Sequence, residues 1–419
     1  MSNVFDELSW RGLVAQTTDE AALREALGGR LTVYCGFDPT APSLHFGNLV
    51  QLIVLRHLQR AGHRVLGLVG GSTGLIGDPR PTSERVLKTK EQTAADVERI
   101  AAQVRRILDV DTDNPPEFVN NLDWTAPISA LDFLRDYGKY FRVNQMIKKD
   151  AVAARLDSDQ GISYTEFSYQ ILQALDYLHL HREYGCTLQT GGQDQWGNLT
   201  SGVDLIGRAE GASVHAFTTP LLTDSSGEKF GKSAGNAIWL DPSMTSPYAF
   251  YQYWLNTEDA SVVMLLKVFT DRTAEDIADL ERQVAEEPFR RAAQRALAAD
   301  VTTLVHGAEA TAAVQRASQV LFGKEDPASL DAGTLRDACA ELPRARAAVG
   351  DEVIDAIVAS GLAESRKAAR RTVSEGGVSL NNRKVDDPEA RWTDEDFLNG
   401  DLALIKRGRK SMAAVERSA

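Results

Sequence analysis

In the first half of the chain, short apolar segments alternate with longer segments of helical periodicity, and glycine-rich loops follow several of the apolar segments directly. The segments 31–37 and 64–69 predict strands, and the segments 48–60 and 89–110 predict helices. Strands that alternate with helices are typical of a parallel sheet with crossover helices. We therefore expect an α/β fold with ligands at the carboxyl ends of its parallel strands.

At 419 residues the chain is longer than one ordinary domain, and its pattern predicts four parts. Residues 1–222 carry the sheet, with a mostly helical insertion at about 120–185. Residues 223–322 begin with a Gly/Ser-rich loop and continue as alanine-rich helices, whereas the polar segment 323–348 contains Gly and Pro and predicts a linker. The last part, 349–419, predicts a small α+β unit with two helices and short strands.

The composition indicates a globular protein in a reducing compartment. Hydrophobic residues make up 43% of the chain, and no apolar run approaches the roughly 18 residues that span a bilayer. The first residues lack the basic and apolar stretches of a secretion signal. Cys35, Cys186 and Cys339 lie far apart, without disulfide or zinc spacing. We expect a cytoplasmic protein with no membrane contact and no metal site of its own.

The net charge of −13 argues against indiscriminate binding of nucleic acid, because phosphates are bound mainly by Lys and Arg. The charge is uneven, however. Residues 361–385 hold six basic residues against two acidic ones, and residues 401–419 hold five against two. An acidic body with a basic end predicts that one polyanion docks at one place.

The segment FDPTAPSLHFGN (37–48) predicts a helix that opens near His45 after a strand and a loop with two prolines. The amide groups of a first helical turn have no partner within the helix, so they attract anions. His45 and Asn48 add side-chain donors, and Gly47 lets a ligand approach the backbone closely. A capped helix start with a structural histidine would show the same four residues.

The segment LVGGSTGLIGDP (68–79) places four glycines after a buried strand. Asp78 closes this loop, and its carboxylate is suited to a cationic amino group. The spacing is neither that of a P-loop nor that of a dinucleotide fingerprint. A glycine-rich turn with a capping aspartate remains the alternative.

The segment TEFSYQILQALDY predicts a helix on which Tyr169, Gln173 and Asp176 share one face, opposite most of the apolar residues. Periodicity alone favours a solvated polar face. A tyrosine, an amide and an acid in one stripe would also suit a polar organic ligand. The pattern leaves both interpretations open.

Two further loops combine glycine with polar residues. In LQTGGQDQWGN, a strand runs into Gly191 and Gly192, and the following Asp194 and Gln195 could bind sugar hydroxyls or a carboxylate. A tight turn with surface polar groups is the alternative.

The segment SSGEKFGKSAGN (225–236) holds Lys229 and Lys232 in a Gly/Ser-rich setting. Mobile lysines are suited to gripping a phosphate chain whose charge grows as a bond breaks. A solvated surface loop would look similar.

Together, HFGN at 45–48 and KFGKS at 229–233 resemble the two ATP motifs of class I aminoacyl-tRNA synthetases, usually written HIGH and KMSKS. Asn48 replaces the last histidine, and Phe230-Gly231 replaces Met-Ser, whereas both lysines stand. The longer motifs YCGFDPTAPSLHFGN, LVGGSTGLIGDP, EFSYQILQALDY and GGQDQWGN are similar to bacterial tyrosyl-tRNA synthetases, and the resemblance covers nearly the whole chain.

This resemblance implies a Rossmann-like parallel-sheet catalytic domain with a helical insertion, an α-helical domain and a small α+β RNA-binding module. It implies an enzyme that activates L-tyrosine with ATP and transfers it to tRNA(Tyr). ATP would enter with Mg²⁺ as substrate, and no cofactor would stay bound. The family is homodimeric through its helical insertion, here around 127–149.

The resemblance also assigns contacts with tyrosine. Tyr34 and Asp176 would meet the phenol hydroxyl, and Gln195 would lie near the carboxylate. The ammonium group would be held by Asp78, Tyr169 and Gln173.

On the ATP side, Asp38 would lie near the reacting end and Gly47 at the start of the helix. The residues that would line the adenosine are Cys35, Gly36, Gly192 and Asp194. The residues that would meet the phosphates are Thr40, His45, Asn48, Lys229 and Lys232, joined by Arg85. The residues of the basic helix that would meet RNA are Arg366, Lys367, Arg370 and Arg371.

Three other functions fit parts of the sequence. An adenylyltransferase of the same superfamily would use HFGN, but such enzymes usually lack the lysine loop, the helical domain and the basic tail. A tryptophan-activating relative would not need the pair Tyr34 and Asp176. An RNA-binding protein with a decayed catalytic domain is opposed by the intact residues His45, Asp78, Lys229 and Lys232.

Overall fold

The computed structural model describes residues 3–80, 83, 85–159, 161–223, 230, 232–233, 236–322, 326–340, 342–408 and 411–418. The chain forms two compact units. The first comprises Met1–Met244 and Thr257–Leu297, and the second comprises Thr245–Asn256 and Ala298–Ala419.

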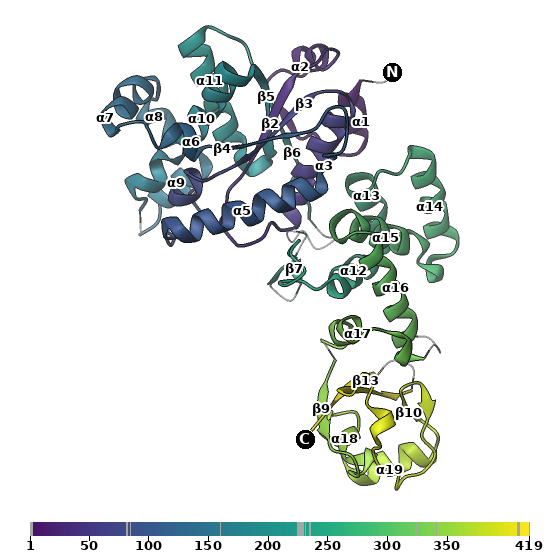
Figure 1. Ribbon diagram of the computed structural model, residues 1–419. Coiled ribbons are helices and arrows are strands. Elements are labelled where there is room, and N and C mark those ends of the chain that lie inside the picture. The colour runs from purple at the N-terminus through teal and green to yellow at the C-terminus, as the bar shows by residue number, and fades with distance from the viewer. Residues whose placement is uncertain are drawn as a thin grey trace. The chain divides into compact units, whose positions relative to one another are not determined.

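A six-stranded sheet forms the centre of the first unit (Figure 1). Its order is β1-β6-β5-β2-β3-β4, and all neighbours are parallel except β1 and β6. The strands are β1 (Gln16–Thr17), β2 (Thr32–Phe37), β3 (Arg64–Val69), β4 (Glu117–Asn120), β5 (Cys186–Gly192) and β6 (His215–Thr219). The predicted α/β class with a parallel sheet is confirmed.

The order of the strands determines where a ligand can bind. From β2 the chain continues outward on one side through β3 and β4, and it then returns to place β5 on the other side of β2. Such a reversal opens a crevice beyond the carboxyl ends of the two strands that flank it. Here those ends are Phe37 of β2 and Gly192 of β5.

Four long helices pack on this sheet and include the predicted helices around 48–60 and 89–110. Helices α3 and α5 contact β3, whereas α10 and α11 contact each other and β5. Capping boxes begin α3 at His45 and α5 at Thr89, and Gly185 ends α10 in the left-handed conformation. The helices are α3 (Phe46–Arg60), α5 (Lys90–Ile107), α10 (Tyr164–Tyr184) and α11 (Trp196–Glu210).

The segment between β4 and β5 is mostly helical, as the sequence predicted. Before α10 it consists of short helices rather than long ones. These are α6 (Leu122–Thr125), α7 (Ala130–Asp132), η1 (Phe133–Tyr137), η2 (Gly138–Tyr140), α8 (Val143–Met146) and α9 (Asp150–Leu156).

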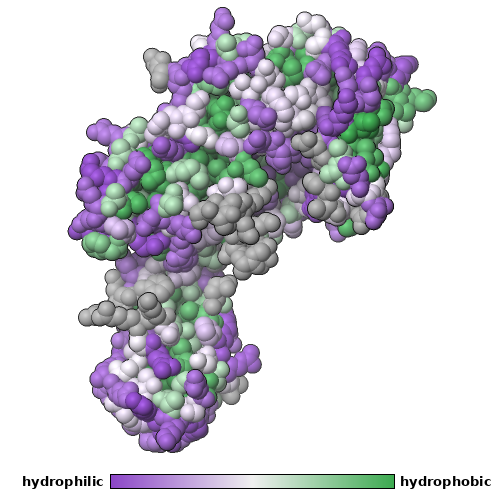
Figure 2. All heavy atoms as spheres, turned by 180° about the vertical axis from the view of Figure 1, so that it is seen from behind, coloured by the Kyte–Doolittle hydropathy of each residue, from purple (hydrophilic) through white to green (hydrophobic). Residues whose placement is uncertain are grey.

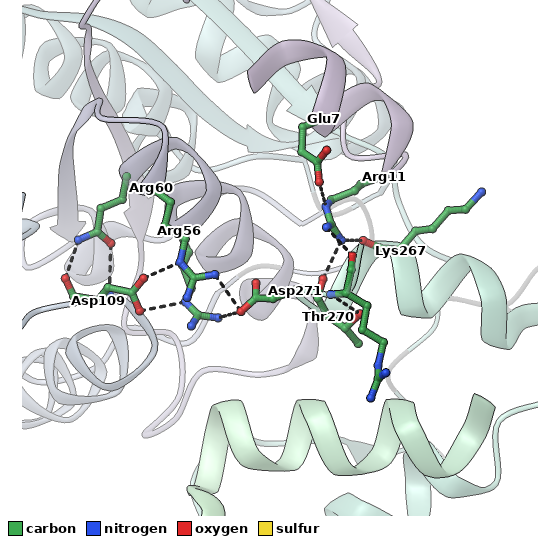
Figure 3. Close-up of polar contacts among 10 residues, drawn as sticks. Glu7, Arg11, Arg56, Arg60, Asp109, Lys267, Thr270 and Asp271 are labelled. Atoms are coloured by element: carbon green, nitrogen blue, oxygen red, sulfur yellow. Dashed lines mark hydrogen bonds and ion pairs between the residues drawn. The ribbon is translucent and has the colours of Figure 1, made fainter. Parts of the chain in front are cut away.

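A buried arginine after the first helix binds the backbone of residues 267–272 (Figure 3). Arg11 is 4% exposed and lies at the end of α1 (Val4–Trp10). Its guanidinium donates to the carbonyls of Lys267, Thr270 and Arg272 at 2.7–2.9 Å. Because the Lys267 carbonyl lies in the last turn of α13 (Asp259–Phe269) and the other two follow it, Arg11 supplies donors that the helix end lacks.

Two arginines of α3 extend this attachment. Arg56 and Arg60 both contact Asp109 after α5 and Asp271 after α13, at 2.7–3.2 Å (Figure 3). Helix α3 is therefore tied to α5 at one carboxylate and to the helical segment at another.

The second unit contains a five-stranded sheet of order β11-β10-β12-β13-β9. Helices α18 (Val353–Ala359) and α19 (Arg366–Ser374) pack with it around an apolar core that includes Ile357 and Trp392. The strands are β9 (Arg344–Ala347), β10 (Val378–Leu380), β11 (Arg383–Lys384), β12 (Leu402–Arg407) and β13 (Ser411–Arg417).

The segment 323–348, which the sequence predicted as a linker, contains ordered elements. Helix α17 (Ala332–Ala338) packs beside α16 (Ala308–Phe322), and β9 belongs to the C-terminal sheet. One apolar cluster joins these helices to the sheet; its members include Val320, Leu335, Leu404 and Met412. The division into four domains stays a prediction.

No helix among the described residues is both long and apolar enough to cross a membrane. The face seen in Figure 2 intermingles hydrophilic and hydrophobic residues in small patches. Cys35, Cys186 and Cys339 are all buried and unpaired.

Candidate functional site

A pocket of about 290 Å³ opens at the carboxyl ends of β2, β3 and β5, where the sheet order reverses. Its lining includes the predicted tyrosine contacts Tyr34, Asp78, Tyr169, Gln173, Asp176 and Gln195. It also includes the predicted ATP contacts Cys35, Gly36, Asp38, Thr40, His45, Gly47, Asn48, Gly192 and Asp194, together with Arg85.

The deep end of the pocket holds Tyr34 and Asp176, both at most 2% exposed. Asp176 accepts hydrogen bonds from Asn121 Nδ2 and Trp124 Nε1, each at 2.9 Å. Burial raises the pKa of Asp176 to about 8, and these two donors oppose the rise. The Tyr34 hydroxyl has no hydrogen-bond partner among the described residues. The Asp176 carboxyl, which two side chains hold in place, thus lies near the unpaired hydroxyl of Tyr34.

Sequence reasoning missed Asn121 and Trp124. Asn121 is fully buried and also accepts from the Ser72 amide at 2.7 Å, so it joins the loop after β3 to Asp176. The usable signal was the short strand β4, which ends at Asn120 beside β3. Recognising that strand would have put Asn121 at the ligand-binding edge of the sheet.

The polar stripe on α10 is not a solvated face, which corrects the expectation from periodicity. Tyr169 and Asp176 are 5% and 2% exposed, and the apolar residues Ile171 and Leu175 are buried as well. Helix α10 is covered on several sides, because it packs on α4 (Thr73–Ile76), β5 and α11. Because α10 is buried on several sides, its polar and apolar faces do not differ in burial as those of an amphipathic surface helix do.

Asp38 follows β2 and accepts two hydrogen bonds inside the pocket. Thr73 Oγ1 donates to its Oδ1 at 2.6 Å, and the Tyr169 hydroxyl donates to its Oδ2 at 2.7 Å. Burial raises the pKa of this carboxyl, and both donors oppose the rise. Gly70, at the end of β3, leaves the space for this arrangement, because a Cβ there would lie 2.1 Å from Asp38 Oδ1.

Asp78 accepts hydrogen bonds from two side-chain amides. Gln195 Nε2 donates to its Oδ2 at 2.8 Å, and Asn198 Nδ2 donates to its Oδ1 at 3.1 Å. Burial raises the pKa of Asp78 to about 6, against the effect of these two donors. Asn198 belongs to the GGQDQWGN motif, yet sequence reasoning assigned it no role. The amides of Gln195 and Asn198 thus orient the Asp78 carboxyl, and they favour its ionised form against the effect of burial.

The start of α3 is capped by two side chains of the HFGN motif. His45 Nδ1 accepts from the Gly47 amide at 3.0 Å, and Asn48 Oδ1 accepts from the His45 amide at 3.1 Å. These hydrogen bonds form a capping box, so the histidine and asparagine stabilise the helix start. Both residues also line the pocket.

The second ATP motif is only partly described. Lys229 lies outside the described residues, and the backbone of Lys232 is in β7 (Lys232–Ser233), which pairs with β8 (Asn236–Ala237). The ring of Phe230 lies 5.0 Å from that of Phe46, and Phe230 also lines the pocket. The two motifs are therefore neighbours at this point.

Five polar atoms of the pocket are buried without a hydrogen-bond partner among the described residues. They are Tyr34 Oη, Gln51 Oε1, Gln173 Oε1, Gln189 Oε1 and Thr190 Oγ1. Buried polar groups are normally paired, so this group indicates a polar ligand. Sequence reasoning did not select Gln51, Gln189 or Thr190.

The predicted RNA contacts lie on α19 of the second unit. Most of them form ion pairs with acidic neighbours: Arg366 with Glu352 and Asp355, and Arg371 with Glu375. Arg370 contacts Glu352 and Glu389 at 3.6 and 3.3 Å. Lys367 is exposed and has no ion-pair partner in the described part of the chain.

Comparisons with known proteins agree with this geometry. Residues 26–323 match the family model "tRNA synthetases class I (W and Y)", and residues 334–415 match "Tyrosine--tRNA ligase SYY-like C-terminal domain". The tyrosine--tRNA ligase of Leifsonia xyli subsp. xyli is 60% identical over 99% of this chain and 94% of its own. That of Streptomyces avermitilis is 57% identical over 99% of both chains.

Solved structures give the same result. C-terminally truncated mitochondrial tyrosyl-tRNA synthetases of Aspergillus nidulans and Coccidioides posadasii match with TM-scores of 0.69 and 0.67. They are 31% and 29% identical, and the matches cover 77% and 75% of this chain and 95% and 92% of theirs. The chain therefore belongs to the class I tRNA synthetases of the tryptophan and tyrosine group, and within them to the tyrosine--tRNA ligases.

Proposed function

We propose that the chain activates L-tyrosine with ATP in this pocket, releases pyrophosphate, and transfers the tyrosyl group from its adenylate to the 3′ end of tRNA(Tyr). One observation carries the proposal: the unpartnered Tyr34 hydroxyl and the carboxylate of Asp176 line the same buried end. A phenol hydroxyl both donates and accepts a hydrogen bond, so it can satisfy both groups. Phenylalanine would leave the Tyr34 hydroxyl unpaired and would give Asp176 no donor besides Asn121 and Trp124.

The amino acid would lie with its charged end toward Asp78. The Asp78 carboxylate would hold the ammonium group together with the Tyr169 hydroxyl and the Gln173 amide oxygen, which has no partner among the described residues. Gln195 Nε2 would turn partly from Asp78 toward the substrate carboxylate. The carboxylate then points toward Asp38 and the start of α3.

ATP would occupy the rest of the pocket. The adenosine would contact Cys35, Gly36, Gly192 and Asp194. The phosphates would lie at the first turn of α3, where free amides favour anions. The side chains proposed to meet the phosphates are Thr40, His45, Asn48, Lys229, Lys232 and Arg85.

Magnesium would enter with the nucleotide. No group of three or more His, Cys, Asp or Glu side chains suited to a metal ion occurs among the described residues. As part of the substrate, the ion would neutralise charge on the departing pyrophosphate.

The reaction needs no nucleophile or general base from the protein. The tyrosine carboxylate attacks the α-phosphorus, and the bond to the pyrophosphate oxygen breaks. A terminal ribose hydroxyl of the tRNA then attacks the carbonyl carbon of the adenylate, and AMP leaves with the hydroxyl proton on its phosphate. The residues of the pocket contribute orientation and stabilisation of charge in the transition state.

The module of residues 349–419 would bind the tRNA. Lys367 supports this proposal because it is exposed and has no ion-pair partner among the described residues, so its charge is available. Arg366, Arg370 and Arg371 would exchange acidic neighbours for phosphates, and contacts of this kind weaken as salt rises.

The chain would act as a cytoplasmic homodimer. Four apolar residues of the helical insertion are exposed: Leu131 by 79%, Leu134 by 51%, Val143 by 62% and Ile147 by 38%. Exposed apolar residues gathered on one segment are typical of protein interfaces. The three unpaired cysteines support a reducing compartment.

Tyrosine-dependent exchange between ATP and labelled pyrophosphate tests the proposal. We expect strong exchange with tyrosine and none above background with phenylalanine or tryptophan, followed by charging of tRNA(Tyr). Exchange with tryptophan instead would identify the enzyme as its tryptophan-activating relative. A lack of exchange with any amino acid would leave an RNA-binding protein as the better account.

Tyrosine binding should strengthen as pH rises through about 6. The ammonium group requires an ionised Asp78, and burial raises the pKa of this carboxyl to about 6 in the empty pocket. Below that pH, binding must release a proton, so Kd should rise up to about tenfold per pH unit. Equilibrium dialysis with labelled tyrosine between pH 5 and 7 measures this.

Asp78→Asn is the control, because it should bind weakly and lack this step. Asp176, whose pKa burial raises to about 8, would add a separate step at higher pH in both proteins. An equal Kd at pH 5 and pH 7 for folded wild-type protein would contradict the assignment of Asp78.

A further inference from the structure

A buried ion pair lies just outside the lining of the pocket. Arg155 Nη1 lies 2.8 Å from Glu166 Oε2, and the two side chains are 1% and 2% exposed. Arg155 stands near the end of α9, and Glu166 stands in the first turn of α10. Burying two charges costs as much as their attraction returns, so such a pair adds little stability by itself. The role of the pair therefore depends on the other contacts that the two side chains make.

Each side chain also binds a backbone group near the pocket, at Arg80 or at Arg85. Glu166 Oε1 accepts from the Arg85 amide at 2.8 Å, and Arg155 Nη1 donates to the Arg80 carbonyl at 3.3 Å. One ion pair therefore contacts the backbone at two residues, Arg80 and Arg85.

Arg85 connects these backbone contacts to the pocket. Its Nε donates to the Asp78 carbonyl at 2.8 Å, and its side chain lines the pocket. Gly77 has a positive φ of 81°, and a Cβ there would lie 3.1 Å from Arg85 Cγ. The backbone and the side-chain stem of Arg85 are thus both confined, so its guanidinium can take few positions.

We propose that Arg155 and Glu166 are positioning residues for ATP: they fix the backbone at Arg80 and Arg85 so that the Arg85 guanidinium is already aimed at the polyphosphate. The inference rests on the proposed phosphate role of Arg85. Orienting a charged group before the substrate arrives removes the cost of ordering it during the reaction.

Glu166→Ala should raise the KM for ATP, and the KM for pyrophosphate in the reverse reaction, by about 10- to 100-fold, since small displacements of a catalytic charge have effects of this size. The tyrosine KM should change little, because the Asp78 carboxylate is held by Gln195 and Asn198. Arg85→Met should show the same split between substrates. Adding Glu166→Ala to Arg85→Met should change nothing further, because both substitutions remove one interaction.

Two variants separate positioning from folding. Arg155→Met with Glu166→Gln removes both charges and keeps an amide oxygen that accepts from the Arg85 amide, so it should regain most of the ATP affinity that Glu166→Ala loses. Glu117→Ala removes the Arg64–Glu117 ion pair, whose Nε–Oε1 distance is 2.6 Å and which does not line the pocket. It should leave all KM values as in the wild type.

The kinetics of these variants distinguish the positioning role of Arg155 and Glu166 from the phosphate role of Arg85. A wild-type ATP KM in folded Glu166→Ala, while Arg85→Met is impaired, overturns the positioning role alone. Equal loss for tyrosine and ATP, or full additivity with Arg85→Met, overturns it as well and indicates a structural ion pair. An unimpaired Arg85→Met overturns the phosphate role of Arg85 and this inference with it.

Discussion

Asp176→Ala should lower kcat/KM for tyrosine in pyrophosphate exchange by about 10²- to 10³-fold, from about 3–4 kcal/mol of lost interaction. The variant removes the acceptor for the phenol hydroxyl. It also leaves the amide of Asn121 and the indole N–H of Trp124 without their common partner. Most of the loss should appear in the tyrosine KM, because the phosphate end of the pocket is unchanged.

The control for this variant is Asp204→Ala, which removes an exposed carboxylate from α11 outside the pocket. Melting temperatures measured beside the kinetics separate a damaged pocket from a damaged fold. An Asp176→Ala protein that folds normally and keeps wild-type kcat/KM would contradict the phenol assignment and favour another amino acid as substrate.

Gly70→Ala should reduce the exchange rate by about 10²-fold, since misplacement by about 1 Å near reacting groups has effects of this size. The added methyl would lie 2.1 Å from Asp38 Oδ1 and 2.3 Å from Thr73 Oγ1, closer than atoms can approach. Asp38 must then leave its hydrogen bonds to Thr73 and Tyr169. Overpacking of this kind also costs about 1–3 kcal/mol of stability.

Gly207→Ala in α11 is the matched control, because its new methyl would lie 3.9 Å from the Ala212 carbonyl oxygen, an ordinary van der Waals distance. Alanine favours helix more than glycine does, so this variant should be as stable as the wild type or slightly more stable. Wild-type exchange by Gly70→Ala would show that the position of Asp38 has no importance for the reaction.

The sequence predicted the fold class well because the parallel strands are short apolar segments and their connections have helical spacing. Helix α3 was recognisable from its start at His45, and β3 from an apolar run between Gly62 and Gly70. The elements that were missed are short or exposed. Strand β4 has four residues, all only half-buried, and β11 has two exposed ones, so neither carries a clear pattern.

The residues of the candidate site also fall into two groups, those that the sequence predicted and those that it did not. Residues within long motifs, such as Asp78, Gln195 and Tyr169, were selected because their neighbours in the sequence form a recognisable loop or helix. Asn121 and Trp124 were not, because their importance arises from a contact with Asp176 more than fifty positions away. The linker prediction failed to anticipate α17 because polar residues and glycine also occur in short capped helices, here capped by Asp331.

Leu404 and Met412 stand on strands of the module that we propose binds RNA, yet they pack into the same cluster as Val320 and Leu335 of the neighbouring helices. A substitution at either position would therefore affect both the packing of the module and the packing of helices α16 and α17 against it. Exchange of this module between relatives, by recombination or in the laboratory, should succeed only when its apolar underside is exchanged together with α16 and α17.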